Sequence, residues 1–287
     1  MKFAASVKSD SPELAAQQTL IDTHFQAHSV AWRDVYEHNS IEGEIYRKRL
    51  EVVLSLIDGL AVPTGDTFLE IGCGAGRATV ALAQRGYFVQ AIDPAPNMVT
   101  ITRQYAAEAG VAPLVSTSVG HASLLDFPEQ RFGLVLAIGV MPYLTSPEKA
   151  LAEMAQVLKP GGFLLLTAGN RWRLNHILDP WLCPPLQPAR RFFARILRPF
   201  RKLRPEPFRP SLRFESGTEF DASLAAAGFV TLKRTTVGFQ PLTIRQRPIL
   251  REQTSIKLNR ALQSLADRNM PGVRSLGMDH IFLARKD

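Results

Sequence analysis

The sequence predicts an α/β fold in which a mainly parallel sheet is covered by helices on both faces. From about residue 66 onward, short apolar runs alternate with segments of helical length. A glycine-rich turn follows the first apolar run, and an acidic residue ends the second. Strands that are apolar along their whole length, rather than at alternate positions, are typical of a parallel sheet that is buried on both faces.

Seven strands and four core helices are expected in this region. The strands are predicted at residues 67–72, 88–93, 114–117, 132–138, 162–168, 229–237 and 280–284. The helices are predicted at residues 77–84, 96–108, 147–158 and 218–227, with a further helical stretch at 249–266. The turn Lys159-Pro160-Gly161-Gly162 separates the third core helix from the fifth strand, because proline and glycine interrupt regular structure.

The chain is expected to divide into four segments around this core. Residues 1–65 form an N-terminal helical cap, in which 1–20 are polar and expected to be mobile and 21–60 show helical spacing. Residues 66–169 hold the cofactor-binding part of the core. Residues 170–213 are a basic, aromatic-rich insertion. Residues 214–287 complete the sheet and carry a helical insertion at 241–276, which we expect to form a lid together with the basic insertion.

The composition is that of an ordinary globular protein. Of the 287 residues 46% are hydrophobic, and no apolar run approaches the roughly 18 residues needed to span a bilayer. The start of the chain lacks the apolar stretch of a secretory signal. The two cysteines, Cys73 and Cys183, form neither a disulfide framework nor a zinc-ligand spacing. We therefore expect a cytoplasmic protein without a bound metal.

The strongest functional signal is the segment that reads Phe-Leu-Glu-Ile-Gly-Cys-Gly-Ala-Gly-Arg from Phe68 onward. Glycines in a strand-to-helix turn let a ligand approach the backbone closely, and the helix N-terminus that follows offers free N–H groups. Asp93 ends the next strand, 17 residues after Gly76, where a carboxylate can accept hydrogen bonds from both hydroxyls of a ribose. The Gly-x-Gly-x-Gly spacing differs from the Gly-x-Gly-x-x-Gly of dinucleotide sites.

This segment resembles the first motif of the class I S-adenosylmethionine-dependent methyltransferase superfamily, in which an acid precedes three alternate glycines. The resemblance covers about residues 67–167 and the late strands. It implies a Rossmann-like sheet of seven strands in the order 3-2-1-4-5-7-6, in which the strand at 280–284 runs antiparallel. It also implies that S-adenosylmethionine is the cofactor.

The resemblance assigns cofactor contacts to particular residues. The implied set is Glu70, Gly72, Gly74, Gly76, Asp93, Pro94, His121, Ala122 and Ile138. Glu70 would organise the methionine end, and Asp93 would hold the ribose. Two positions depart from the family pattern: His121 stands where an aspartate usually receives the adenine amino group, and Gly133 stands where an aspartate usually follows phenylalanine. A neutral histidine can accept the adenine bond, and the alternative is a partly exposed loop histidine.

The acceptor is expected beyond the carboxyl ends of strands four and five. The predicted substrate contacts are Tyr36, Met141, Tyr143, Asn170 and Trp172. Tyr143 and His176 are candidate catalytic bases by residue type alone, and the alternative for each is packing or surface polarity. The sequence lacks the Asn/Asp-Pro-Pro-aromatic tetrapeptide of many amino-methylating relatives, which weakens nucleic-acid adenine and protein amide targets without excluding them. Oxygen is the expected acceptor atom.

Positive charge is concentrated in the insertion. Residues 171–213 contain eleven basic and two acidic residues, so their net charge of +9 exceeds the +8 of the whole chain. On a helical wheel of residues 189–203, Phe192, Phe193 and Phe200 lie on one side and arginines on the other. Such a helix can lie on an anionic membrane, contact RNA, or serve as an ordinary lid, and its apolar face favours membrane over RNA.

We therefore predict that the chain transfers a methyl group from S-adenosylmethionine to a small or lipophilic acceptor, at oxygen. A lid at the membrane surface would suit a quinone, polyketide, fatty-acyl or isoprenoid acceptor. Two other functions stay open at this point. One is RNA methylation with the basic insertion as the RNA-binding surface. The other is S-adenosylmethionine binding without catalysis, because no base is certain.

Overall fold

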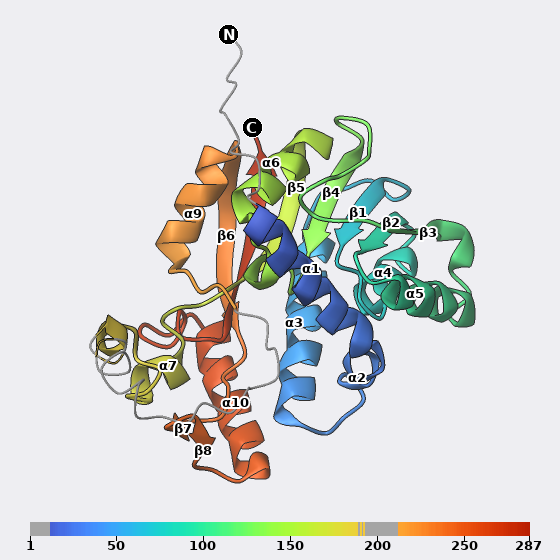
Figure 1. Ribbon diagram of the computed structural model, residues 1–287. Helices are drawn as coiled ribbons and strands as arrows, with labels where there is room; N and C mark the ends of the chain where they lie inside the picture. The colour runs from blue at the N-terminus through green and yellow to red at the C-terminus, as the bar shows by residue number, and fades with distance from the viewer. Residues whose placement is uncertain (1–11, 189, 191, 193–211) are drawn as a thin grey trace.

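The computed structural model describes residues 12–188, 190, 192 and 212–287. Its centre is a seven-stranded sheet in the order β3-β2-β1-β4-β5-β9-β6 (Figure 1). The strands are β1 (Thr67–Ile71), β2 (Phe88–Asp93), β3 (Val115–Val119), β4 (Phe132–Ala137), β5 (Leu158–Gly169), β6 (Phe229–Val237) and β9 (Asp279–Lys286). The last strand, β9, is antiparallel to both of its neighbours, and the other pairs are parallel. The predicted strand order and the antiparallel strand are confirmed.

Helices cover both faces of the sheet, as the apolar strands predicted. The core helices are α4 (Arg77–Ala83), α5 (Pro96–Glu108), α6 (Pro147–Val157) and α9 (Gly217–Ala226). On one face, Leu151 of α6 and Leu224 of α9 pack in a buried cluster with Leu69 of β1. On the other face, Leu82 of α4 joins a second buried cluster with Phe68 of β1. Consecutive residues of β1 therefore serve opposite layers of the core.

The N-terminal segment folds as α1 (Pro12–Ala27), α2 (Ser29–Asp34) and α3 (Ile41–Asp58). The expectation that residues 12–20 are mobile is wrong, because these residues form the first half of α1. Only Ile21 of this helix is buried. The helix docks largely through polar side chains, so the polar composition on which the expectation rested does not distinguish a docked helix from a mobile segment. In Figure 1, α1 crosses in front of the carboxyl ends of the central strands.

The segment after β5 forms a small lobe below the sheet (Figure 1). It contains α7 (Leu174–Leu178), the two-residue strands β7 (Thr243–Ile244) and β8 (Arg247–Pro248), and α10 (Glu252–Asp267). Short 3-10 turns occur at Ala112–Leu114, Met141–Tyr143 and Pro184–Leu186. The sequence predicted α10 but not α7 or the β7–β8 hairpin. The amphipathic helix predicted at 189–203 lies outside the described residues, apart from Arg190 and Phe192.

Asp179 organises this lobe. Its fully buried carboxylate accepts hydrogen bonds from the Thr243 hydroxyl at 2.6 Å and from the backbone N–H groups of Trp181 at 2.9 Å and Gln246 at 2.8 Å. The hydrogen bonds lower the pKa of Asp179 even though burial alone would raise it. The carboxylate therefore holds the turn after α7 against the β7–β8 hairpin, which explains why two such short strands persist.

Candidate functional site

The glycine-rich turn between β1 and α4 has a left-handed backbone at all three of its glycines. The φ angles of Gly72, Gly74 and Gly76 are +71°, +52° and +77°. A Cβ at Gly72 would lie 2.5 Å from Val140, and one at Gly76 would lie 3.0 Å from Thr102, whereas a Cβ at Gly74 would meet nothing within 4 Å. Gly72 and Gly76 therefore permit close packing within the protein, and Gly74 faces open space.

Glu70, the last but one residue of β1, lies beneath this turn with its carboxyl group buried. The Thr79 hydroxyl donates a 2.5 Å hydrogen bond to its Oε2 atom. Burial raises the pKa of Glu70 to about 8 despite that bond. A carboxyl group in this condition carries a proton at neutral pH until a cation arrives, and the ammonium group of a methionine is such a cation.

Asp93 ends β2 beside the same turn. Its carboxylate accepts hydrogen bonds from the backbone N–H of Gly74 at 3.0 Å and of Ala95 at 2.9 Å. Burial raises the pKa of Asp93 to about 6, while these two hydrogen bonds oppose the rise. The carboxylate is thus fixed in orientation next to the open space at Gly74, where it can accept hydrogen bonds from a ligand.

A single cavity joins the glycine turn to the N-terminal helices. Its core side contains most of the predicted cofactor residues, including Glu70, Gly72, Gly74, Asp93, Pro94 and Ile138. Its other side is formed by residues of α1, α2 and α3 and by the 3-10 turn after β4, among them Gln18, Asp22, Phe25, Trp32, Tyr36, Tyr46, Arg49 and Tyr143. Residues of the three N-terminal helices therefore line the cavity opposite the glycine turn, and the turn after β4 completes its floor.

Five aromatic rings form a continuous wall on the cap side of this cavity, hereafter the aromatic wall. It consists of Tyr143, Phe25, Trp32, Tyr46 and Tyr36. The Phe25 ring lies 4.8 Å from Tyr143, edge to face, and 5.6 Å from Trp32. The Tyr46 ring lies 5.9 Å from both Trp32 and Tyr36. Such contacts fix the rings at low entropic cost and present a largely aromatic surface.

Among the described residues that line this cavity, Arg49 of α3 is the one buried cation. It is only 8% exposed, and its guanidinium lies 4.6 Å from the centre of the Tyr46 ring. Its Nη1 atom lies 3.4 Å from Asp279 Oδ2, and its Nε has no hydrogen-bond partner among the described residues. A Cβ on Gly139 would come within 3.5 Å of both terminal nitrogens of Arg49. The guanidinium can therefore receive an anionic group of a ligand.

Several predicted site residues lie outside this cavity, although they stay near it in the chain. Gly76 begins α4, and Ala122 is buried in the core. The His121 side chain is 48% exposed and does not line the cavity. Met141 is packed in the core cluster. These positions do not line the cavity. Of the residues predicted to contact the acceptor, only Tyr36 and Tyr143 line it.

Three predicted residues have other roles in the structure. The Asn170 side chain donates hydrogen bonds of 2.8 Å to the carbonyls of Ser275 and Gly277, so it ties β5 to the segment before β9. Trp172 is 41% exposed. His176 packs edge to face on Phe214, and burial lowers its pKa to about 4. His176 is therefore neutral at pH 7, but it does not line the cavity.

Sequence reasoning missed Arg49, Asp22 and Phe25 as site residues. Arg49 had a detectable signal, because it lies four residues after Ile45 and four before Val53 on an otherwise apolar helix face. A cation at such a position is usually paired or functional. Asp22 and Phe25 gave no comparable signal, since their importance depends on where α1 docks.

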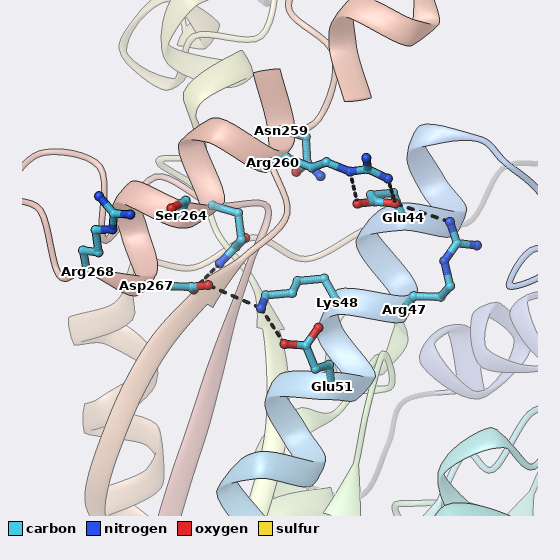
Figure 2. Close-up of a pocket in the computed structure, with 10 residues that line it drawn as sticks. Glu44, Arg47, Lys48, Glu51, Asn259, Arg260, Ser264, Asp267 and Arg268 are labelled. Carbon is cyan, nitrogen blue, oxygen red and sulfur yellow. Dashed lines mark hydrogen bonds and ion pairs between the residues drawn. The ribbon is translucent and has the colours of Figure 1, made fainter. Parts of the chain in front are cut away.

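A second depression lies between α3 and α10, away from the glycine turn (Figure 2). Its charged side chains are largely occupied with one another. Arg260 pairs with Glu44 at 2.6 Å, and Lys48 lies 2.7 Å from Glu51 and 3.4 Å from Asp267. Exposed pairs of this kind contribute little to stability and leave little charge for a ligand. The depression is thus a solvated contact between two helices.

The comparisons with known proteins match the core of the chain to methyltransferases. Residues 69–166 match the family model described as a methyltransferase domain. A ubiquinone biosynthesis O-methyltransferase of Paracidovorax citrulli is 30% identical over 41% of this chain and 50% of its own length. A protein of the same description from a Chelativorans strain is 25% identical over 63% of this chain and 65% of its own length. The chain therefore spans between half and two thirds of these two relatives.

Solved structures extend the likeness in fold to nearly the whole chain. Magnesium protoporphyrin IX methyltransferase from Synechocystis superposes with a TM-score of 0.61 at 15% identity, over 94% of this chain and all of the other. The [4+2]-cyclase SpnF gives 0.60 at 19% identity, over 94% and 96%. At these identities the fold alone is shown.

The fold, the glycine turn and the family match define a class. The match at residues 69–166 identifies a class I S-adenosylmethionine-dependent methyltransferase domain within the chain. S-adenosylmethionine is the methyl donor of that class. In the described residues, no helix combines the length and apolar character needed to cross a membrane, and no group of three or more histidine, cysteine or acidic side chains is arranged for a metal ion.

Proposed function

We propose that the chain transfers the methyl group of S-adenosylmethionine to an oxygen atom of a small, lipophilic acceptor. The observation that carries this proposal is the aromatic wall, which faces the glycine turn across one cavity. Aromatic surfaces suit a flat or apolar acceptor rather than a charged polymer. The O-methyltransferase names of the curated relatives support oxygen as the acceptor atom.

The residues present fit the cofactor at three points. Asp93 offers its carboxylate to the ribose hydroxyls, Glu70 offers a buried carboxyl to the methionine ammonium, and Arg49 offers a guanidinium to the methionine carboxylate. The cofactor supplies an electrophilic methyl group on a sulfonium. The protein's own contribution is then to hold the acceptor oxygen in line and to exclude water, which the aromatic wall favours.

Tyr143 is better suited to orient the acceptor than to take its proton. Its ring is part of the aromatic wall, and burial raises the pKa of its hydroxyl. A phenol that keeps its proton at neutral pH can donate a hydrogen bond to an acceptor oxygen. An acceptor with an acidic hydroxyl, such as a phenol, would lose its proton most easily and needs the least help from a base.

Incubation with labelled S-adenosylmethionine and fractionated extracts tests this function. Label should appear in the lipid or small-metabolite fraction and be released by treatments that cleave methyl ethers or esters. Label in the RNA fraction instead would identify an RNA methyltransferase. Tight binding of S-adenosylhomocysteine with no labelled fraction would favour a binding protein without catalysis.

A second part of the proposal is peripheral contact with an anionic membrane, which would bring a lipophilic acceptor to the site. The described part of the lobe around Asp179 leaves Leu178, Trp181 and Ile244 exposed by 52%, 44% and 56%. Arg190 lies over the Trp181 ring at 5.4 Å. Exposed apolar side chains beside arginines are the composition of a surface that enters a lipid headgroup layer.

A further inference from the structure

The N-terminal helix α1 is fastened over the cavity by one polar face. Gln18, Asp22 and Gln26 are spaced four residues apart, so they project from the same side of the helix. Gln18 accepts hydrogen bonds from the backbone N–H and hydroxyl of Thr145, and Gln26 accepts one from the N–H of Asn97 at 3.1 Å. Thr145 lies in the loop after β4, and Asn97 lies in the first turn of α5, which follows β2, so α1 bridges two segments at the carboxyl ends of the sheet.

The middle residue of this face, Asp22, differs from the other two. It lines the cavity together with Asp93, and its side chain is 18% exposed. One carboxylate oxygen, Oδ1, accepts a 3.1 Å hydrogen bond from Gln18. The other, Oδ2, lies 3.6 Å from His121 Nδ1, which is beyond hydrogen-bonding distance. That oxygen is therefore the better placed of the two to accept a bond from a ligand.

Adenosine presents more donors than Asp93 can satisfy. The two ribose hydroxyls and the exocyclic amino group of adenine are separate hydrogen-bond donors. Asp93 already accepts two backbone N–H groups and is positioned for the ribose. The His121 side chain follows β3 but does not reach the cavity wall. Asp22 is the remaining carboxylate at this end of the described cavity.

We propose that Asp22 of α1 accepts the hydrogen bond from the adenine amino group of the bound cofactor. This inference rests on the proposed use of S-adenosylmethionine and names a further binding residue for it. The role that the sequence assigned to His121 then passes to a carboxylate from another segment of the chain, and His121 lies beside it. Nearness to Asp93 adds to the benefit of a ligand donor, because the two carboxylates repel each other.

The same kind of exchange is visible elsewhere in the molecule. Gly133 lacks the carboxylate expected after Phe132, and the space that its Cβ would fill is taken by Asp66, whose Oδ2 would lie 2.0 Å away. Asp66 accepts hydrogen bonds from Lys159 Nζ at 2.7 Å and from the Thr67 N–H at 2.8 Å. A carboxylate missing from one position of this fold is thus supplied by a neighbouring one.

Calorimetric binding of two ligands to the full chain tests the inference without reference to activity. The ligands are S-adenosylhomocysteine and S-inosylhomocysteine, in which a carbonyl oxygen replaces the amino group and would face the Asp22 carboxylate. The wild type should prefer the adenosyl ligand by about tenfold or more, the scale of a hydrogen bond to a charged group. Asp22→Ala should bind the adenosyl ligand about tenfold more weakly and show a preference of less than about twofold.

Gln26→Ala is the matched control, because it removes a contact of the same helix face without touching the carboxylate. It should retain the preference between the two ligands. Equal preference in Asp22→Ala and the wild type would overturn the inference, as would loss of preference in Gln26→Ala to the same degree. Failure of the wild type to bind S-adenosylhomocysteine at all would instead overturn the proposed function, so the two failures are distinguishable.

Discussion

Arg49 and Asp279 form a buried ion pair that joins α3 to the first residue of β9, with Nη1 and Oδ2 3.4 Å apart. The two residues are 230 positions apart in the chain. Burial raises the pKa of Asp279, and its two arginine neighbours, Arg49 and Arg173, oppose that rise. The ion pair thus anchors α3 to the sheet at the edge of the cavity, which Arg49 lines.

Substitution of Arg49 should affect both folding and cofactor binding. Arg49→Gln leaves the Asp279 carboxylate buried without its partner, so we expect a loss of about 3–5 kcal/mol in the free energy of unfolding. Affinity for S-adenosylhomocysteine should fall by about tenfold or more, because a charge-assisted contact is removed. Denaturant titration and calorimetry measure the two effects.

Asp279→Asn separates these effects, since it removes the ion pair and keeps the cation. It should destabilise the fold while leaving cofactor affinity at or above the wild-type value. If Arg49→Gln binds S-adenosylhomocysteine as tightly as the wild type, Arg49 has no role in cofactor binding.

A methyl group at Gly74 should block the cofactor with little effect elsewhere. The Cβ of Gly74→Ala enters open space of the cavity, so loss of S-adenosylhomocysteine binding by at least about tenfold is expected. Gly110→Ala is the control, because Gly110 has a φ of +71° and also has nothing within 4 Å of its Cβ, but does not line the cavity. Both variants should lose about 1 kcal/mol of stability from backbone strain. Equal binding by both variants would place the ligand elsewhere.

Glu70 should make the unliganded protein less stable as the pH rises. Its pKa of about 8 in the fold lies above the ordinary 4.5, so its stabilising contribution is complete below pH 4.5 and is lost as the pH approaches 8. Between these pH values the free energy of unfolding should decline with pH less steeply for Glu70→Gln than for the wild type. The difference between the two slopes should be about 1 kcal/mol per pH unit. Glu51→Gln, on an exposed side chain of α3, should retain the wild-type slope. Parallel slopes for the wild type and Glu70→Gln would contradict the burial of a neutral carboxyl.

Vesicle flotation tests the membrane contact. The wild type should float with anionic vesicles at low salt and release as the salt concentration rises, because each basic residue near the surface contributes about 1 kcal/mol. The double variant Trp181→Ser, Ile244→Ser should float less, whereas Leu232→Ser, which removes a 47% exposed apolar side chain from β6, should float normally. Absence of flotation of the wild type at low salt would rule out this contact.

The core of the fold was predictable because its signals are local. The strands β2 and β6 begin and end at the predicted residues, and β1, β3 and β4 differ by at most two residues at an end. The largely apolar sequences of β1, β2 and β4 indicate both the secondary structure and the burial of two faces. The glycine turn and Asp93 were predictable for the same reason, since a turn and a strand end fix the site at the carboxyl edge.

The acceptor side of the site was less predictable, because it depends on how distant segments dock. Phe25 and Asp22 reach the cavity only through the placement of α1, which is held by polar contacts such as those of Gln18. Asn170 was predicted as a site residue because it follows β5, but its side-chain NH2 group donates hydrogen bonds to two backbone carbonyls. Nothing in the local sequence distinguishes these outcomes.

The two sides of the cavity come from different stretches of the chain. Four of the five rings of the aromatic wall come from the first 46 residues, before the first strand, whereas most of the proposed cofactor contacts come from the sheet that follows. Substitution of these four rings is therefore expected to change acceptor preference while the donor site is kept, provided that Asp22 of the same stretch is retained. Exchange of this stretch between homologues is accordingly a direct route to altered selectivity, and divergence among relatives should concentrate there.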